Sequence, residues 1–229
     1  MTLLAIIIFL GCKPETKKVA SGIGSNGKIS IKNMLTPTGE KLLPAEEGTI
    51  RSDLGEPVID TNTFILEISG LVDSSFNLTW NEIRDLPVAY SDTILMYCVE
   101  GWEVWGNWKG IKVKDLLNKA HIQPEGKYVL FSSVDGYTTS LPVSYLEKYN
   151  AILAYNVNGS PLKVYDGFPL RLIAFGKYGY KWAKWINKLK VINQSQIGYW
   201  ESYGYSDQAD VPVSRRSYYE GPNTMPLQY

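Results

Sequence analysis

The sequence predicts an α+β fold in which a mixed β-sheet is accompanied by short helices. Runs that alternate, or that are rich in β-branched residues, outnumber runs with helical spacing. Several of these runs follow one another after too few residues for a helical crossover, so some neighbouring strands must be antiparallel. With 229 residues, the chain can form one large domain with a sizeable core, or a domain with appendages.

Three elements are predicted in the first part of this domain. Thr63–Ser69 alternates apolar and polar residues and predicts a strand. Thr79 and Glu82 have the spacing of a capping box, which predicts a short helix that ends before Pro87. The apolar run Ile94–Val99 predicts a buried strand that carries Cys98.

The remaining elements continue the same pattern. Apolar residues at helical spacing predict a helix at Val113–Ala120. Further strands are predicted at Tyr128–Ser133, Tyr137–Leu141, Ala151–Val157, Leu170–Phe175 and Trp185–Ile192, and a further helix at Val143–Tyr149. Asp135-Gly136 and Asn158-Gly159 mark turns, and the Tyr-rich segment from Gln194 onwards is predicted to be irregular.

The N-terminus has the pattern of an export signal. Leu3–Leu10 is an unbroken apolar run that is too short to span a bilayer as a helix. The ending Phe9-Leu-Gly-Cys12 resembles a bacterial lipobox, in which Cys12 becomes the lipidated first residue. A buried N-terminal strand is the alternative. The lipoprotein interpretation predicts an extracytoplasmic protein that is anchored to a membrane, on its periplasmic side or at the cell surface.

Composition then divides the chain and limits its partners. We predict a signal segment at 1–12, a Gly-, Ser- and Pro-rich tether at 13–57, a folded domain at 58–205 and an irregular tail at 206–229. The formal net charge is zero, so no broad surface for nucleic acid is implied, and no nucleic-acid partner is expected.

Cys98 is the first candidate for chemistry. If Cys12 carries lipid, Cys98 has no second cysteine with which to form a disulfide, and an exported thiol must then be buried or used. A catalytic thiolate needs a base, but the one histidine, His121, falls at a predicted helix end. A zinc site needs about four ligands, which these residues do not supply. An inert buried cysteine remains possible, as does one thiolate that binds a metal whose other ligands come from a cofactor.

A second stretch could hold such a cofactor. Asp166–Trp185 contains Arg171, Lys177, Lys181 and Lys184, interleaved with glycines and aromatic residues. Cations and Gly-containing turns suit a phosphate, and aromatic faces suit a heterocycle. The alternative is a solvated basic loop whose aromatic residues lie in the core.

Five segments together resemble the molybdopterin-binding domain of the sulfite oxidase superfamily. They are Cys98-Val-Glu-Gly-Trp102 with Trp108–Leu117, Asp135-Gly-Tyr137, Gly167-Phe-Pro-Leu-Arg171, Gly176–Trp185 and Gly198–Tyr205. The resemblance covers about Thr63 to Tyr205 and is nearest to small prokaryotic members such as the periplasmic methionine sulfoxide reductase branch. It implies the mixed α+β fold of that family.

The resemblance also implies site residues. Cys98 would be the catalytic residue and the thiolate ligand of molybdenum, and Arg171 and Lys184 would bind the phosphate of the molybdopterin. Ser133 stands where the reductase branch has a hydroxyl residue near the pterin, and Asp166 where it has an asparagine. With the basic cluster, the predicted cofactor-binding residues are Ser133, Asp166, Arg171, Lys181, Trp182 and Lys184.

The function implied is two-electron oxygen-atom transfer on a small molecule that is sulfoxide- or sulfite-like. No C-x-x-C-H haem motif is present, so electrons would be exchanged with an external carrier, either a cytochrome or a membrane haem subunit. The alternative is a non-catalytic lipoprotein domain of the same fold that binds a ligand or another protein.

Overall fold

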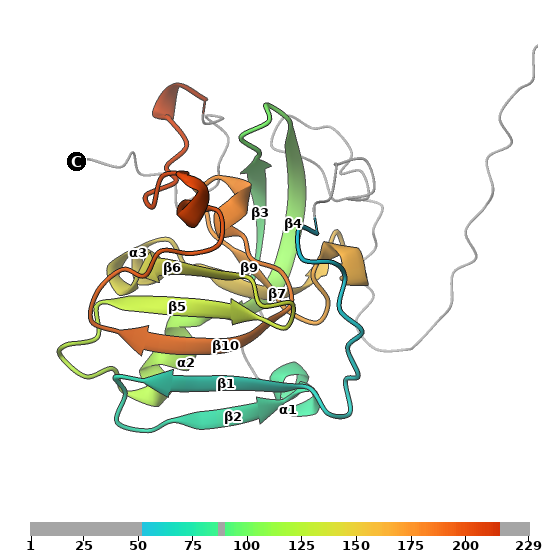
Figure 1. The fold of residues 1–229 in the computed structure, drawn as a ribbon. Coiled ribbons are helices and arrows are strands. Elements are labelled where there is room, and N and C mark those ends of the chain that lie inside the picture. Colours follow the sequence, from blue (N-terminus) through green and yellow to red (C-terminus); the bar gives the residue numbers. More distant parts are fainter. Residues whose placement is uncertain (1–51, 87–89, 216–229) are drawn as a thin grey trace, which may run out of the picture. The chain divides into compact units, whose positions relative to one another are not determined.

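The computed structural model describes residues 52–86 and 90–215, which all belong to one compact unit. These residues form two five-stranded sheets and a few short helices (Figure 1). The predicted α+β class with mixed strand directions is therefore confirmed. Cys12, the signal segment and most of the tether lie outside the described residues.

The first sheet is mixed and has the strand order β2-β1-β10-β5-β6. Its strands are β1 (Ile65–Gly70), β2 (Phe76–Thr79), β5 (Tyr128–Ser133), β6 (Thr138–Pro142) and β10 (Ile186–Ile192). Strand β1 runs parallel to β10, with Glu67 opposite Lys188, and the other neighbours are antiparallel. The first and last strands of the domain therefore lie side by side (Figure 1).

The second sheet is antiparallel throughout. Its strands are β3 (Tyr90–Tyr97), β4 (Glu103–Lys112), β7 (Ile152–Val157), β8 (Ser160–Pro161) and β9 (Arg171–Ile173). Strands β3 and β4 form a long hairpin whose loop begins at Cys98, and β7 pairs with β4, β8 and β9. Cys98 thus directly follows the last residue of β3, whereas the sequence predicts a strand at Ile94–Val99 that includes it.

The helices follow the predicted signals closely. Helix α1 (Trp80–Asp85) begins with a capping box in which Thr79 and Glu82 bond to each other's backbone N–H groups. Helix α2 (Val113–Ala120) has the predicted bounds and buries its apolar face, and α3 is Val143–Lys148. His121 is the exposed residue that ends α2, in the left-handed conformation.

Strands β2, β4 and β8 were not predicted, and β4 shows why. Gly106 and Gly110 within it look like breaks in a strand, because glycine weakens an isolated strand. In the fold they admit close contacts instead. A Cβ atom on Gly106 would lie 2.6 Å from the indole of Trp108, and one on Gly110 would lie 2.0 Å from the carbonyl oxygen of Leu153 in β7.

The core joins both sheets and fixes the segment before β10. Trp108 of β4 and Trp182 are both buried and meet edge to face, with ring centroids 5.9 Å apart. This contact anchors the aromatic and basic segment at 179–185 on β4, the strand that follows the Cys98 loop.

The C-terminal segment is irregular as predicted, apart from the 3₁₀ turns η5 (Glu201–Tyr203) and η6 (Val213–Arg215). Part of this segment packs into the interior, because Glu201, Ala209 and Val211 are buried. The backbone N–H of Tyr199 donates to the carbonyl of Thr138 at the start of β6, 2.9 Å away.

Candidate functional site

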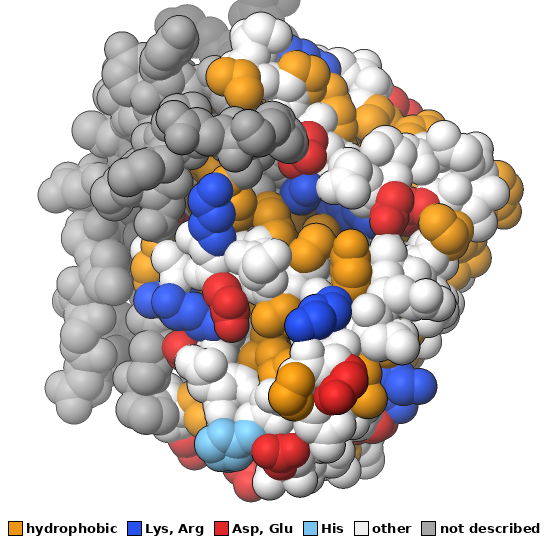
Figure 2. Space-filling model, turned by 90° about the vertical axis from the view of Figure 1, so that its left-hand side faces the viewer, with side chains coloured by type: hydrophobic (Ala, Val, Ile, Leu, Met, Phe, Trp, Pro, Cys, Tyr) orange, Lys and Arg blue, Asp and Glu red, His pale blue; other side chains and the backbone are white. Residues whose placement is uncertain are grey.

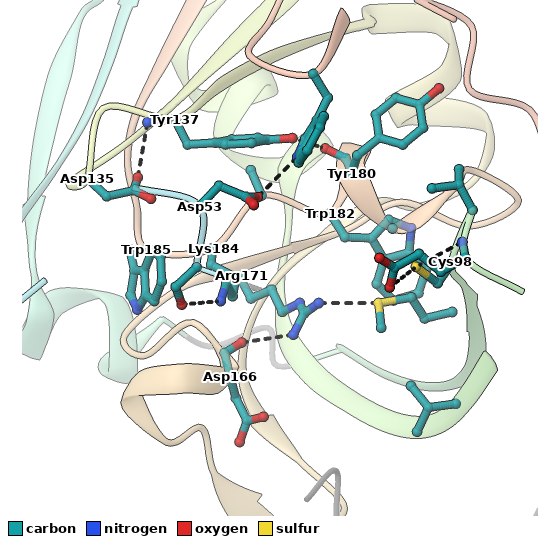
Figure 3. Close-up of a pocket in the computed structure, with 18 of the residues that line it drawn as sticks. Asp53, Cys98, Asp135, Tyr137, Asp166, Arg171, Tyr180, Trp182, Lys184 and Trp185 are labelled. Atoms are coloured by element: carbon teal, nitrogen blue, oxygen red, sulfur yellow. Dashed lines mark hydrogen bonds between the residues drawn. The ribbon is translucent and has the colours of Figure 1, made fainter. Parts of the chain in front are cut away.

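One cleft brings together residues from six parts of the chain. Its empty volume is about 1120 Å³, including the part that opens to solvent. The lining comes from Ser52 and Asp53, the β3–β4 hairpin, Asp135 and Tyr137, Asp166 and Arg171, the segment 179–185, and Trp200 with Tyr205. Figure 3 shows Cys98 and Lys184 on opposite sides of the Arg171 guanidinium.

A tight loop presents the Cys98 thiol to the cleft. The N–H of Cys98 donates to the carbonyl of Trp102 (2.9 Å), and the N–H of Gly101 donates to the carbonyl of Cys98 (3.2 Å). Gly101 has φ +99°, a conformation that glycine adopts without strain. The thiol is partly buried and forms no disulfide among the described residues.

Glu100 lies beside this thiol. Its backbone N–H donates to Cys98 Sγ at 3.5 Å, and the thiol in turn points at Glu100 Oε2, 3.8 Å away. Trp102 Nε1 donates to the same carboxylate oxygen at 3.1 Å. A protonatable group is therefore held next to the sulfur.

Arg171, at the start of β9, is the buried cation of the cleft. Its Nη1 donates to the carbonyl of Asp166 (3.1 Å), its Nη2 contacts Met96 Sδ (3.2 Å), and its guanidinium lies over the ring of Trp108. Burial lowers the pKa of Arg171 to about 10, although the Asp166 carboxylate opposes the shift. Arg171 Nε is buried and has no hydrogen-bond partner among the described residues.

Asp166, like Arg171, has a buried polar atom that lacks a hydrogen-bond partner among the described residues. Burial raises the pKa of its carboxyl group, with Arg171 acting in the opposite direction. One carboxylate oxygen accepts from the N–H of Lys163 at 3.4 Å. The other, Oδ1, is buried without a partner among the described residues. Buried polar atoms are normally satisfied, so these two indicate a missing ligand.

Lys184 supplies a second cation. Its Nζ donates to Ser52 Oγ and to the carbonyl of Tyr165, both at 3.2 Å, and lies 4.2 Å from the ring centroid of Trp185. Burial, together with the charge of Arg171, lowers the pKa of Lys184 to about 8.

Gly167 allows the two cations to converge. It has φ +109°, and a Cβ atom there would lie 3.1 Å from the Cβ atoms of both Arg171 and Lys184. The turn that carries Asp166 can therefore approach both basic residues only with glycine at this position.

Aromatic side chains form much of the remaining wall. Trp182 and Trp185 are buried, and their indole N–H groups donate to the carbonyls of Lys177 (3.0 Å) and Val164 (2.7 Å). Tyr137 donates its hydroxyl to the carbonyl of Tyr180 at 2.5 Å. These bonds fix the rings, so the wall is rigid before any ligand enters.

Four of the predicted cofactor-binding residues line the cleft together with Cys98: Asp166, Arg171, Trp182 and Lys184. Ser133 does not, although its buried hydroxyl has no partner among the described residues and it precedes the cleft-lining turn at Asp135. Lys181 points away from the cleft into an ion pair with Glu201, at 2.5 Å. The predicted cofactor-binding role of Lys181 therefore has no contact in the structure to support it.

Sequence reasoning missed several lining residues. Ser52 and Asp53 belong to the predicted tether, and Met96 looks like an ordinary strand residue. Glu100, Trp200 and Tyr205 lie within motifs singled out by resemblance but carried no individual role. Their proximity arises only from tertiary structure.

The donor set fits a cofactor that carries both a metal and a phosphate. No group of three or more His, Cys, Asp or Glu residues in the described part of the chain could hold a metal ion. A metal bound by Cys98 would therefore need its remaining ligands from the cofactor. Arg171 and Lys184 suit a phosphate, Asp166 Oδ1 can accept from a ring N–H, and the indoles suit a flat heterocycle.

Comparisons with known proteins agree with this arrangement. Residues 53–200 match the family described as "Oxidoreductase molybdopterin binding domain". The chain is 33% identical over 158 residues to the uncharacterized oxidoreductase YuiH of Bacillus subtilis. The aligned region covers 69% of this chain and 79% of YuiH. The chain is 35% identical over 149 residues to a putative protein-methionine-sulfoxide reductase subunit, YedZ1, of Azospira oryzae, with coverages of 65% and 56%.

A solved structure shares the fold. The sulfane dehydrogenase SoxCD from Paracoccus pantotrophus superposes with a TM-score of 0.58 at 22% identity, over 62% of this chain and 41% of that one. The chain thus spans only about half the length of some relatives. The family match spans residues 53–200, which include every residue that lines the cleft except Ser52 and Tyr205. The chain therefore belongs to the oxidoreductase molybdopterin-binding domain family, the family of the sulfite oxidases.

Proposed function

We propose that this protein binds molybdopterin and catalyses two-electron oxygen-atom transfer on a small substrate, exchanging electrons with an external carrier. The observation that carries the proposal is the shared cleft of Cys98, Arg171 and Lys184. The partnerless atoms of Arg171 and Asp166 in the same cleft support it.

Each part of the cofactor has a matching group. The Cys98 thiolate would bind molybdenum, Arg171 and Lys184 would hold the phosphate, and Trp182 would pack on the heterocycle. Bound molybdenum supplies a centre that takes up and releases two electrons. The buried indoles and the partly buried thiol limit the access of water to that centre.

The charge distribution favours an uncharged S-oxide over sulfite as the substrate. Both cations of the cleft, Arg171 and Lys184, would be engaged by the phosphate. The rest of the described lining contains no further Lys or Arg, and the loop of Cys98 carries the acidic Glu100 beside Trp102. A doubly charged anion would be repelled there, whereas a sulfoxide would not.

Reduction of a sulfoxide needs two electrons and two protons. The S–O bond breaks, the sulfur keeps a new lone pair, and the oxygen leaves as water. Electrons would come from the external carrier. Glu100 would pass on the protons, because its carboxyl group adjoins Cys98 Sγ and the one histidine lies exposed at the end of α2.

Elemental and pterin analysis tests the cofactor assignment. Protein made in a molybdenum-replete host that synthesises the cofactor should contain about one molybdenum per chain. Cys98→Ser should lose the thiolate ligand, its spectrum and methionine sulfoxide reductase activity measured with reduced benzyl viologen. Retention of all three would refute the assignment of the ligand. A wild-type protein without molybdenum would favour the alternative, a non-catalytic domain that binds a ligand or partner.

We also propose an electron carrier and a cellular location for this protein. The relative named as a reductase subunit supports a separate cytochrome or membrane haem subunit as the carrier. Leu3–Leu10 and Cys12 support lipid anchoring in an extracytoplasmic compartment. Labelling with radioactive palmitate should mark the wild type and not Cys12→Ala.

Two observations bear on other partners. None of the helices within 52–86 and 90–215 has the length and apolarity needed to cross a membrane. On the face shown in Figure 2, basic and acidic side chains are interspersed among hydrophobic ones. That face offers no patch of one sign for nucleic acid, in keeping with the zero net charge.

A further inference from the structure

Lys181 is the centre of a buried charge cluster that the proposed mechanism does not use. It is fully buried, and its Nζ contacts Glu201 Oε1 (2.5 Å), the carbonyl of Ser140 (3.1 Å) and Asp207 Oδ1 (3.2 Å). Thr139 donates its hydroxyl to the same Glu201 oxygen at 2.8 Å. The ammonium thus joins β6 to two points of the C-terminal segment.

Both sides of this cluster continue directly into the cleft. Lys181 lies between Tyr180 and Trp182, and Glu201 follows Trp200, and all three of these aromatic residues line the cleft. The ring of Tyr205 connects two of them, because its centroid lies 5.1 Å from that of Trp200 and 5.4 Å from that of Tyr180. A shift of the Glu201 carboxylate would therefore move one wall relative to the other.

The surroundings leave little freedom for such a shift. A Cβ atom on Gly198 would lie 2.4 Å from the carbonyl of Thr138 and 2.6 Å from Glu201 Oε2. At the outer end, Trp200 Nε1 donates to Asp53 Oδ2 at 3.2 Å. The Lys181–Glu201 ion pair is therefore closely packed, and the indole of Trp200 next to it has a defined orientation at the cleft.

We infer that Lys181 is a positioning residue, which acts through Glu201 to hold Trp200 and Tyr205 in the aromatic wall of the cleft. In this role Lys181 determines how well the substrate is bound and leaves the cofactor in place. The inference about substrate binding rests on the proposed oxidoreductase function, whereas the position of Trp200 does not.

The test uses a double variant, because removing one partner of a buried ion pair leaves an uncompensated charge that can prevent folding. Lys181→Met with Glu201→Gln removes both charges and keeps an acceptor for Thr139. The matched control is Lys177→Met with Asp210→Asn. This control removes the ion pair of another buried lysine, in which Lys177 Nζ lies 2.8 Å from Asp210 Oδ1. Lys177 Nζ also donates to the carbonyl of Gln208, and neither Gln208 nor Asp210 lines the cleft.

Three measurements are made on full-length protein purified with its cofactor. The first is molybdenum content, the second is kcat and KM for methionine sulfoxide with reduced benzyl viologen, and the third is the indole ¹⁵N–¹H signal of Trp200, identified with Trp200→Phe. For the double variant we expect unchanged molybdenum, a shifted Trp200 signal, kcat within about twofold and KM raised about tenfold. The control should match the wild type in all three.

Two results would overturn the inference. One is a folded double variant with wild-type KM and an unmoved Trp200 signal. The other is loss of molybdenum at unchanged KM, which would mean that Lys181 holds the cofactor itself. If the double variant does not fold, Asp207→Asn, at a side chain 31% exposed, should still shift the Trp200 signal and raise KM. If the wild type contains no molybdenum, the Trp200 signal alone decides the positioning role.

Discussion

The buried charge of Lys184 destabilises the fold, although the same charge suits the cleft for a phosphate. Its ammonium is mostly buried beside Arg171, and these two facts lower its pKa to about 8 from the ordinary value of 10.5. A folded-state pKa below the unfolded one means that the charged form destabilises the fold. In the proposed complex with molybdopterin, a phosphate between the two cations would reverse the sign of this interaction.

A pH titration of stability should reveal this cost. Between about pH 8 and 10.5 the folded protein has lost the Lys184 proton while the unfolded chain keeps it, so the free energy of unfolding of cofactor-free protein rises with pH. Lys184→Met should remove this rise and stabilise the cofactor-free protein at pH 7 by no more than about 3 kcal/mol. Denaturant unfolding at several pH values measures both. Equal pH dependence in the two proteins would contradict the burial argument.

Glu100 makes a second prediction at the scale of one residue. Glu100→Gln keeps the size of the side chain and removes its acidic proton, so kcat for sulfoxide reduction should fall about 100-fold. Molybdenum content and KM should stay at wild-type values.

Asp53→Asn is the matched control for this variant. Asp53 lines the same cleft but accepts from Trp200 and is not bonded to the thiol. Its kcat should change by less than about twofold. Comparable losses in both variants would rule out a specific proton-transfer role for Glu100.

At the scale of elements, the β3–β4 hairpin places the thiol, and β4 depends on two glycines. The close approach of β7 at Gly110 is a backbone contact, which cannot relax by a change of rotamer. The bulge between Lys109 and Gly110 lies at the same place. The hairpin and β7 are therefore packed more closely than any side chain at this position would allow.

Gly110→Ala should consequently destabilise the fold by about 3 kcal/mol, the upper range for overpacking. Gly136→Ala is the comparison, because Gly136 has φ +91° but an added Cβ atom would meet nothing within 4 Å. Its cost should be only about 1 kcal/mol, from backbone strain alone. Thermal and denaturant unfolding give the two values, and a smaller loss in Gly110→Ala would contradict the packing argument.

Elements whose signals are local could be predicted from the sequence. The capping box at Thr79 and the apolar face of α2 depend on residues within one or two turns, and both appear in the structure with the predicted limits. Strand β4 could not be predicted, because its glycines are explained only by contacts with β7 and with Trp108.

The same distinction applies to the site. Lys181 and Lys184 look alike in the sequence as basic residues of one aromatic segment. Lys181 ends the 3₁₀ turn η4 (Gly179–Lys181), and three residues later Lys184 faces the cleft. The direction of Lys181 is determined by partners that are distant in the sequence, at Ser140, Glu201 and Asp207.

At the scale of the whole molecule, the cleft depends on the ends of the domain. Asp53 and Trp200 hydrogen-bond to each other, and Ser52 bonds to Lys184. Two residues of the predicted tether, Ser52 and Asp53, are thus parts of the site, together with the irregular segment that follows Gln194. Predicting them requires knowing that the first and last segments of the domain meet.

The parallel pairing of β1 with β10 has a consequence for biosynthesis. β1 is made early but lies between β2 and β10, so half of its backbone hydrogen bonds wait for the last strand. Loop closure over nearly the whole domain makes this pairing slow. A chain emerging from the ribosome therefore cannot complete the sheet that contains β1 until β10 (Ile186–Ile192) has been synthesised, so the proposed cofactor could be inserted only after that point.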